Sequence, residues 1–256
     1  MDVLVCVKRV PMVGGRITLT ADGREVDARS LAFTMSPHEE CAVEEAVRLV
    51  EREGGSVTVA TLGPPEAAEQ LRDAIAVGAN HAVLLRTDGR EWSPGATARA
   101  IAGVAERHEA ATGRLYDLML FGNEAADTGD YQVPVRVAHL LGRPCATGIK
   151  HLEVDVHGAH ASREYRGVTE RFELALPAVV SVKEGINLPR YPSLPGRMRA
   201  KKAAVEEIEP EYWEEGLHLE GLRVPESERR RAEVLGQGVD AVPALVELFE
   251  QLGVLS

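Results

Sequence analysis

The sequence predicts a three-layer α/β fold with a mostly parallel sheet, an antiparallel ribbon and an extended C-terminal arm. Apolar, β-branched runs alternate with helical patterns in residues 1–142, which is typical of a parallel sheet with helices on both faces. Apolar and polar residues then alternate from about residue 152, as in antiparallel strands. Residues 206–233 contain 10 Glu and 4 Arg with little apolar periodicity, which indicates an extended segment.

The parallel part of the chain is expected to contain four strands, each followed by a helix. The strands are predicted at residues 3–7, 56–63, 81–85 and 117–122. The first helix begins at a capping box, Ser36 to Glu39, with a proline at its first position. The next helices are expected to open at Pro64, at Ser93 and after the polar loop that follows residue 122.

The remaining chain divides into a ribbon, a long loop and a terminal helix. Residues 152–176 are expected to form the ribbon, and residues 177–182 one more buried strand. The final helix is predicted over residues 239–252, with an apolar stripe made of Val242, Leu245, Val246, Phe249 and Leu252. We therefore assign residues 1–198 to an α/β domain and 199–256 to an arm. Such an arm docks on its own domain or on a partner subunit, and the pattern leaves both open.

Composition excludes several classes of protein. The net charge is −11 and aromatic residues are 4%, which disfavours binding to nucleic acid. The cysteines Cys6, Cys41 and Cys145 are far apart, so neither a disulfide framework nor a metal site is expected. The longest apolar run, residues 174–182, is too short to span a membrane, and the N-terminus does not have the pattern of a signal peptide. A cytoplasmic protein without membrane insertion is expected.

Motifs of common enzymes are missing from the sequence. It contains no Walker A motif, no G-x-G-x-x-G after a strand, no G-x-S-x-G and no H-E-x-x-H. Since a parallel sheet binds ligands beyond the carboxyl ends of its strands, a site is expected where residues 6–8, 62–64 and 121–123 meet the helix start at Ser36.

The loop at residues 122–133 is the best candidate site. It combines small residues, hydroxyl and amide groups and a following helix start, which is how proteins hold a phosphate. Its acids, Glu124, Asp127 and Asp130, fit an acidic surface loop equally well. At position 36, capping of the following helix is enough to explain a serine, and no bound ligand is needed.

The segment NLPRYPSLP at residues 187–195 is a second candidate. Its prolines restrict an exposed loop and lower the entropy lost when the loop binds a partner. An ordinary long connection is the alternative, but the length and the apolar residues favour recognition.

Several segments together identify a family. They are VLVCVKRVP, SPHEECAVEEAVRL, LGP, AIAVGA, DLMLFGNEAAD, REYRG with ELALPAVVSV, and INLPRYPSLPGRMRAKK. Over almost its full length the chain resembles the small, β subunit of electron transfer flavoproteins. This resemblance implies a Rossmann-like fold of the adenine-nucleotide alpha hydrolase type. It also implies a heterodimer with an α subunit that holds most of the FAD, and a structural AMP in the β subunit.

The resemblance further implies an electron carrier without catalytic residues of its own. Electrons would arrive from acyl-CoA or related dehydrogenases and leave to a quinone reductase. By motif, the AMP pocket would contain Cys6, Ser36, Pro37, His38, Glu39, Leu62, Gly63, Gly122, Asn123, Glu124, Ala125, Asp127, Thr128, Gly129, Asp130, Tyr131, Gln132 and Val133.

Other positions would serve the flavin and the partners. Val13 and His38 would approach the flavin ring, where some members of the family have aromatic residues. Leu194 would form the tip of the dehydrogenase recognition loop, and Glu164 would lie at the subunit boundary. The residues beside Leu194 in that loop are Tyr191, Pro192 and Pro195. The chain departs from the family at Pro134, where a glycine is usual and where proline offers no N–H to a phosphate.

Two alternatives are set against this hypothesis. An ATP-binding protein of the universal stress type would need a glycine-rich phosphate loop, which the sequence lacks. An electron-bifurcating flavoprotein subunit would hold FAD in place of AMP, and it differs from the ordinary carrier only in the pocket.

Overall fold

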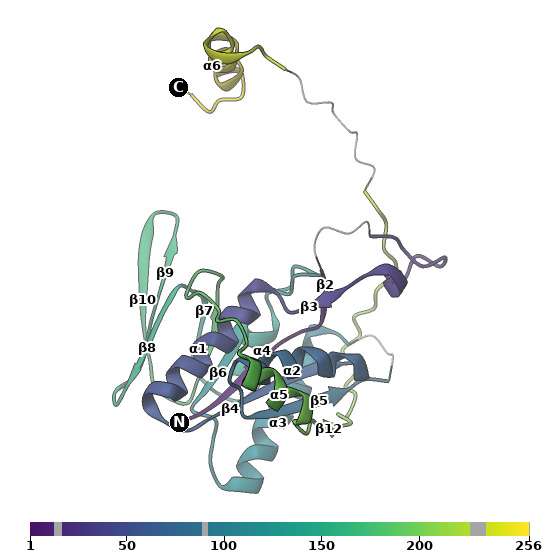
Figure 1. Cartoon of the computed structure of the whole chain (residues 1–256), viewed down its shortest axis with the longest axis vertical. Coiled ribbons are helices and arrows are strands. Elements are labelled where there is room, and N and C mark those ends of the chain that lie inside the picture. The colour runs from purple at the N-terminus through teal and green to yellow at the C-terminus, as the bar shows by residue number, and fades with distance from the viewer. Residues whose placement is uncertain (13–16, 89–91, 226–233, 256) are drawn as a thin grey trace. The chain divides into compact units, whose positions relative to one another are not determined.

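We describe the fold from a computed structural model, which describes residues 1–12, 17–88, 92–225 and 234–255 (Figure 1). The chain divides into two compact units, Met1–Gly221 and Leu222–Ser256. All of the sheets formed by the described residues lie in the first unit. The described residues of the second unit form a 3-10 turn, η3 (Gly238–Ala241), and one helix, α6 (Val242–Gln251).

A seven-stranded sheet forms the centre of the first unit. Its strands are β12, β5, β4, β1, β6, β11 and β7 in spatial order, and every neighbouring pair is parallel. Their bounds are β1 Asp2–Cys6, β4 Ser56–Gly63, β5 His81–Arg86, β6 Leu118–Gly122, β7 Cys145–Ile149, β11 Ala178–Val182 and β12 Glu206–Ile208. The predicted α/β fold with a parallel sheet is confirmed.

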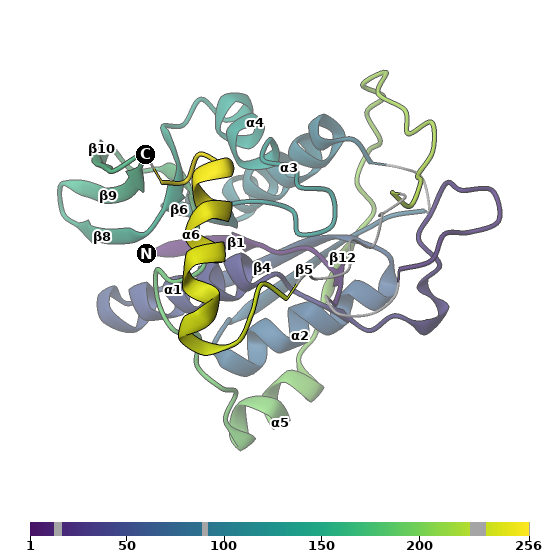
Figure 2. The ribbon, with the colours of Figure 1, turned by 90° about the horizontal axis from the view of Figure 1, so that it is seen from above.

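Helices cover both faces of this sheet (Figure 2). Helices α1 (Pro37–Glu53) and α2 (Ala68–Val77) lie on one face, and α3 (Pro94–Thr112) and α4 (Val133–Leu140) on the other. Alternate residues of β1 therefore enter two different cores. Val3 and Val5 pack with α1 and α2, whereas Leu4 and Cys6 pack with α3. This explains why residues 3–7 form a continuous apolar run.

The starts of α1 and α3 follow the predicted capping pattern. Ser36 accepts a hydrogen bond from the backbone N–H of Glu39, and the Glu39 carboxylate accepts one from the N–H of Ser36. Ser93 caps α3 in the same way, through the N–H of Ala96. Both serines precede a proline at the first helical position.

The predicted antiparallel ribbon is confirmed as a separate three-stranded sheet of β8 (His151–Asp155), β9 (Gly158–Tyr165) and β10 (Val168–Leu174) (Figure 1). One face of the ribbon joins the core through Leu152, Val154, Ala159 and Ala161. A short pair, β2 (Val10–Pro11) with β3 (Phe33–Thr34), and the 3-10 turns η1 (Ala28–Ser30) and η2 (Pro65–Ala67) complete the first unit.

Some elements differ from the prediction. Strand β7 was not expected, because it contains Gly148 and its pairing with β11 shifts register. Helix α5 (Leu194–Lys202) replaces part of the expected loop, since Ser193 caps it. Residues 206–208, which we expected in an extended segment, instead form the edge strand β12 beside β5. The final helix is shorter than expected, because residues 238–241 form η3.

Candidate functional site: a pocket at the strand ends and an exposed apolar loop

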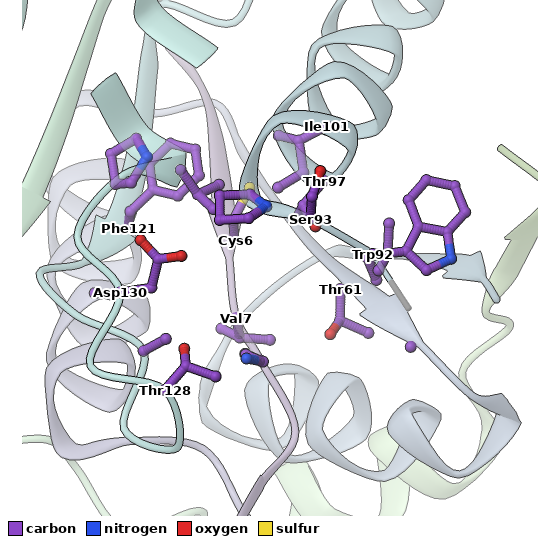
Figure 3. Close-up of a pocket in the computed structure, with 18 of the residues that line it drawn as sticks. Cys6, Val7, Thr61, Trp92, Ser93, Thr97, Ile101, Phe121, Thr128 and Asp130 are labelled. Carbon is purple, nitrogen blue, oxygen red and sulfur yellow. The ribbon is translucent and has the colours of Figure 1, made fainter. Parts of the chain in front are cut away.

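A cavity of about 530 Å³ opens at the carboxyl ends of β1, β4 and β6 (Figure 3). Strand ends supply its floor, and the start of α3 supplies one side. The loop between β6 and α4 supplies another side, and the segment Leu217–Leu219 also contributes. Its size lies within the range of cofactor pockets, roughly 300–1,000 Å³. The cavity therefore lies where a parallel sheet is expected to bind a ligand.

The cavity brings together about half of the residues predicted for a nucleotide. Those that line it are Cys6, Glu39, Leu62, Gly63, Gly122, Glu124, Ala125, Thr128, Asp130 and Val133. Those that lie outside its lining are Ser36, Pro37, His38, Asn123, Asp127, Gly129, Tyr131 and Gln132. Sequence reasoning missed the α3 side of the cavity, which consists of Trp92, Ser93, Pro94, Thr97 and Ile101. The Ser93 cap was visible in the sequence, but its place beside the strand ends was not.

Glu39, in the first turn of α1, also lines the cavity and is buried. Burial raises its pKa to about 7, although hydrogen bonds from Ser36 and the nearby Lys8 favour the ionised form. Gly122 leaves the room that this side chain needs, since a Cβ there would lie 2.7 Å from the Glu39 Cγ. Burial likewise raises the pKa of the Cys6 thiol, so this cysteine is not a thiolate nucleophile.

The loop after β6 is held by its own carboxylates. The Asp127 Oδ1 accepts the N–H of Thr128 at 2.9 Å and pairs with the Lys8 ammonium at 2.8 Å. The Asp130 Oδ1 accepts the N–H of Gln132 at 3.0 Å. The Tyr131 hydroxyl donates to Glu124, and this bond raises the pKa of Tyr131. Two N–H groups of this loop, those of Thr128 and Gln132, are thus already bonded to carboxylates.

His38 links the cavity loop to the loop after β11. Its Nδ1 accepts the N–H of Glu184 at 2.8 Å, and its Nε2 lies 3.7 Å from the Glu124 carboxylate. Asn123 turns away from the cavity, since its Oδ1 accepts the Ser181 hydroxyl at 3.2 Å. Val13, the other residue expected near a flavin, lies outside the described residues.

The segment expected for recognition presents apolar side chains to solvent. Leu194 is 73% exposed and Tyr191 is 94% exposed. Leu194 is the first residue of α5 rather than the tip of a free loop, because Ser193 caps that helix. Pro192 is half-buried and Pro195 is exposed. Tyr191 and Pro195 line a second, separate hollow with α1 and α2, and Leu194 belongs to neither cavity.

Helix α1 holds the chain that leads into this segment. The Arg190 guanidinium binds Glu44 at 2.9 Å and Glu51 at 2.6 Å, and Arg48 donates to the carbonyl of Leu188 at 3.0 Å. Only 2% of the Glu44 side chain is exposed. Burial alone would raise the pKa of Glu44, but hydrogen bonds from Arg190 and Arg48 outweigh it and lower that pKa. The segment is thus fixed on a rigid helix.

The remaining predictions concern Glu164, metal binding and membrane insertion. Glu164 is exposed on β9, opposite Thr169 of β10, and is remote in the chain from the cavity residues. Among the described residues no group of three or more His, Cys, Asp or Glu side chains is arranged to hold a metal. No helix in the described part of the chain is long and apolar enough to cross a membrane.

The chain is similar to a family of known proteins over most of its length. Residues 25–212 match the family model described as the electron transfer flavoprotein domain. The chain is 37% identical to the electron transfer flavoprotein subunit beta of Bacillus subtilis, over 82% of this chain and 79% of that protein. It is 35% identical to the subunit of the same name from Bradyrhizobium diazoefficiens, over the full length of both. The mitochondrial subunit of rice is 33% identical over 94% of this chain and 95% of its own length.

Proposed function

Because this chain belongs to the family of electron transfer flavoprotein beta subunits, we propose that it pairs with an α subunit and carries electrons through a shared FAD. Acyl-CoA or related dehydrogenases would supply the electrons, and a quinone reductase would accept them. The chain contributes binding surfaces rather than catalytic residues. A cytoplasmic location fits its three free cysteines, since unpaired thiols suit a reducing compartment.

The observation that supports a nucleotide in this chain is the cavity at the strand ends. A structural AMP fits its chemistry. The adenosine would lie against apolar residues such as Phe121 and Ile101, and the phosphate near Val133 at the start of α4. Lys8 is a cation in the cavity lining, and a phosphate would compete with Asp127 for it. At neutral pH Glu39 is partly protonated, which reduces repulsion of an anion.

The alternative occupant is a second FAD, as in an electron-bifurcating subunit. Its diphosphate needs more donors than a monophosphate. Pro134 has no N–H to give, and Glu124 and Asp130 would repel a second phosphate beside the cavity. We therefore favour AMP and the ordinary carrier. Family membership leaves no support for the universal stress type of protein.

The exposed apolar surfaces of the chain would bind its partners. Leu194, with Tyr191, Pro192 and Pro195 beside it, would enter a groove on the dehydrogenase. The apolar stripe of α6 would dock on the α subunit. His38 would approach the flavin from this chain's side, together with Val13, and Glu164 would lie at the boundary between the subunits.

Expression of the chain with and without the α subunit tests this proposal. The chain alone should be colourless after purification, because it carries no flavin-binding motif of its own. The two chains expressed together should co-purify as a yellow heterodimer. A chain that alone retained stoichiometric FAD, or that never bound the α subunit, would contradict the proposal.

A further inference from the structure

The segment Tyr212–Leu219, here called the strap, runs past the start of α3 and reaches the cavity. Its first two residues are held by aromatic contacts. The Tyr212 ring meets Trp92 edge to face, with centroids 5.2 Å apart, and the Trp213 ring lies 4.8 Å from the Arg99 guanidinium. Its last residues, Leu217, His218 and Leu219, line the cavity. The strap is thus both fastened to α3 and part of the pocket wall.

Glu215 holds the strap to the starts of α3 and α4. Its Oε2 accepts the Ser93 hydroxyl at 2.6 Å and the N–H of Gly95 at 2.9 Å, and its Oε1 binds the Arg136 guanidinium at 2.7 Å. Arg136 is held in turn by Gln132, at 2.9 and 3.1 Å. The hydrogen bond from Ser93 is the main cause that lowers the pKa of Glu215, so this carboxylate is ionised at neutral pH.

Gly95, in the first turn of α3, leaves room for the Glu215 carboxylate. A Cβ at position 95 would collide with both carboxylate oxygens of Glu215. Glycine weakens the first turn of a helix relative to alanine, so its place there has a cost that the close approach of Glu215 explains. Ser93 and Trp92 lie on the same side of the cavity (Figure 3). One carboxylate therefore joins the starts of α3 and α4 to the cavity wall.

We propose that the strap is the outer wall of the nucleotide pocket and that Glu215 is its positioning residue. This inference rests on the proposed function, because it takes the cavity to hold AMP. With Glu215 in place, Leu217, His218 and Leu219 cover the bound nucleotide and slow its release. Without it, the N–H of Gly95 and the Nη1 of Arg136 lose their acceptor and the wall opens more often.

The test measures release of AMP from the purified heterodimer. Unlabelled AMP in excess displaces radiolabelled AMP, and the protein-bound label is followed with time for the wild type, Glu215→Ala and the control Glu214→Ala. Glu214 is exposed and adjacent in sequence. Loss of hydrogen bonds to a charged group should speed release in Glu215→Ala about tenfold or more, while Glu214→Ala should match the wild type.

A second variant separates positioning from general damage. Gly95→Ala should also speed release, but in the double variant with Glu215→Ala it should add nothing, because its collision partner is gone. The chain has two tryptophans, Trp92 and Trp213, and both contact the strap or belong to it, so its fluorescence should change in Glu215→Ala.

The outcomes distinguish the two proposals. A wild-type heterodimer that binds no AMP would overturn the nucleotide site, and with it the role of the strap. A wild type that binds AMP, with release unchanged in Glu215→Ala while FAD content and circular dichroism stay normal, would overturn the strap alone. If Glu215→Ala fails to assemble, the milder Glu215→Gln should still release AMP faster than Glu214→Gln.

Discussion

Helices α1 and α6 are both amphipathic in sequence, yet they differ completely in burial. Helix α1 buries eight residues, among them Leu49, which has no exposed surface. Helix α6 buries none, and even Phe249, the most covered residue of its apolar stripe, is 36% exposed. The same periodicity therefore predicts a helix in both places, but only α1 is covered within its own compact unit.

The contrast indicates what each helix does. The apolar face of α1 stabilises the sheet, while its charged face fixes the segment that leads to Leu194. The apolar stripe of α6 would otherwise face water, which is unfavourable by roughly 25 cal/mol per Å². The proposed docking of α6 on the α subunit would cover this stripe, so the comparison predicts opposite effects of matched substitutions in the two helices.

Leu49→Ala in α1 and Phe249→Ala in α6 are the first pair. Leu49→Ala should lower the free energy of unfolding of the isolated chain by about 4 kcal/mol, because it leaves a cavity in the core. Phe249→Ala should leave that free energy almost unchanged and weaken binding to the α subunit. Urea unfolding and titration with the α subunit measure the two effects. Strong destabilisation by Phe249→Ala would show that α6 is covered by this chain itself.

Glu39 at the start of α1 should make stability depend on pH. Its folded pKa of about 7 is higher than the unfolded value of 4.5. Its contribution to stability is therefore complete below the unfolded pKa and is lost as the pH rises through the folded pKa. Glu39→Gln keeps the acceptor for Ser36 but does not titrate, so it should remove about 2–3 kcal/mol of the stability change between about pH 5 and pH 8. An identical pH profile in both proteins would show that Glu39 stays charged or exposed.

Leu194→Ala tests whether Leu194, which is exposed at the start of α5, binds the dehydrogenase. Truncation of an interface anchor typically costs at least about 2 kcal/mol, or about thirtyfold in affinity. Turnover with the dehydrogenase at low carrier concentration should fall accordingly, while flavin content and folding stay unchanged. Val156, which is 95% exposed on the ribbon, supplies the control Val156→Ala. Equal turnover in Leu194→Ala and the wild type would remove the recognition role.

Glu44→Gln gives the smallest of the predicted effects. It removes the charge that binds Arg190 and Arg48 but keeps the shape of the side chain. Because Glu51 still holds Arg190, we expect a loss of about 1–2 kcal/mol in the free energy of unfolding. The folded pKa of Glu44 is lowered, so this contribution should disappear as the pH falls through that pKa. Glu40→Gln, at an exposed position of the same helix, is the control, and an equal loss there would contradict the special role of Glu44.

Much of the fold was predictable from the sequence because the buried strands are mostly apolar. Strand β4 has the predicted bounds, and the capping box at Ser36 forms as expected. Strands β7 and β12 were missed for a physical reason, since both lie at an edge of the sheet and need no long apolar run. Helix α5 has little apolar periodicity, and its cap at Ser193 lies among prolines.

The sides of the site built from strand ends and from the loop after β6 were predictable, but the sides built from α3 and Leu217–Leu219 were not. Parallel topology brings the residues after β1, β4 and β6 together wherever such a sheet forms. The contact between Ser93 and Glu215 joins residues 122 positions apart, and no local sequence pattern predicts it. The loop after β6 was identified, but its carboxylates bind its own N–H groups, which a count of charges does not reveal.

Analysis of the nucleotides in the assembled protein decides whether the cavity holds AMP. The heterodimer is purified, denatured and filtered, and the released nucleotides are separated and quantified for each dimer. We predict one FAD, shared with the α subunit, and one AMP from the cavity beside Glu39 and Val133. Two FAD and no AMP would contradict an AMP-filled cavity and favour an electron-bifurcating subunit.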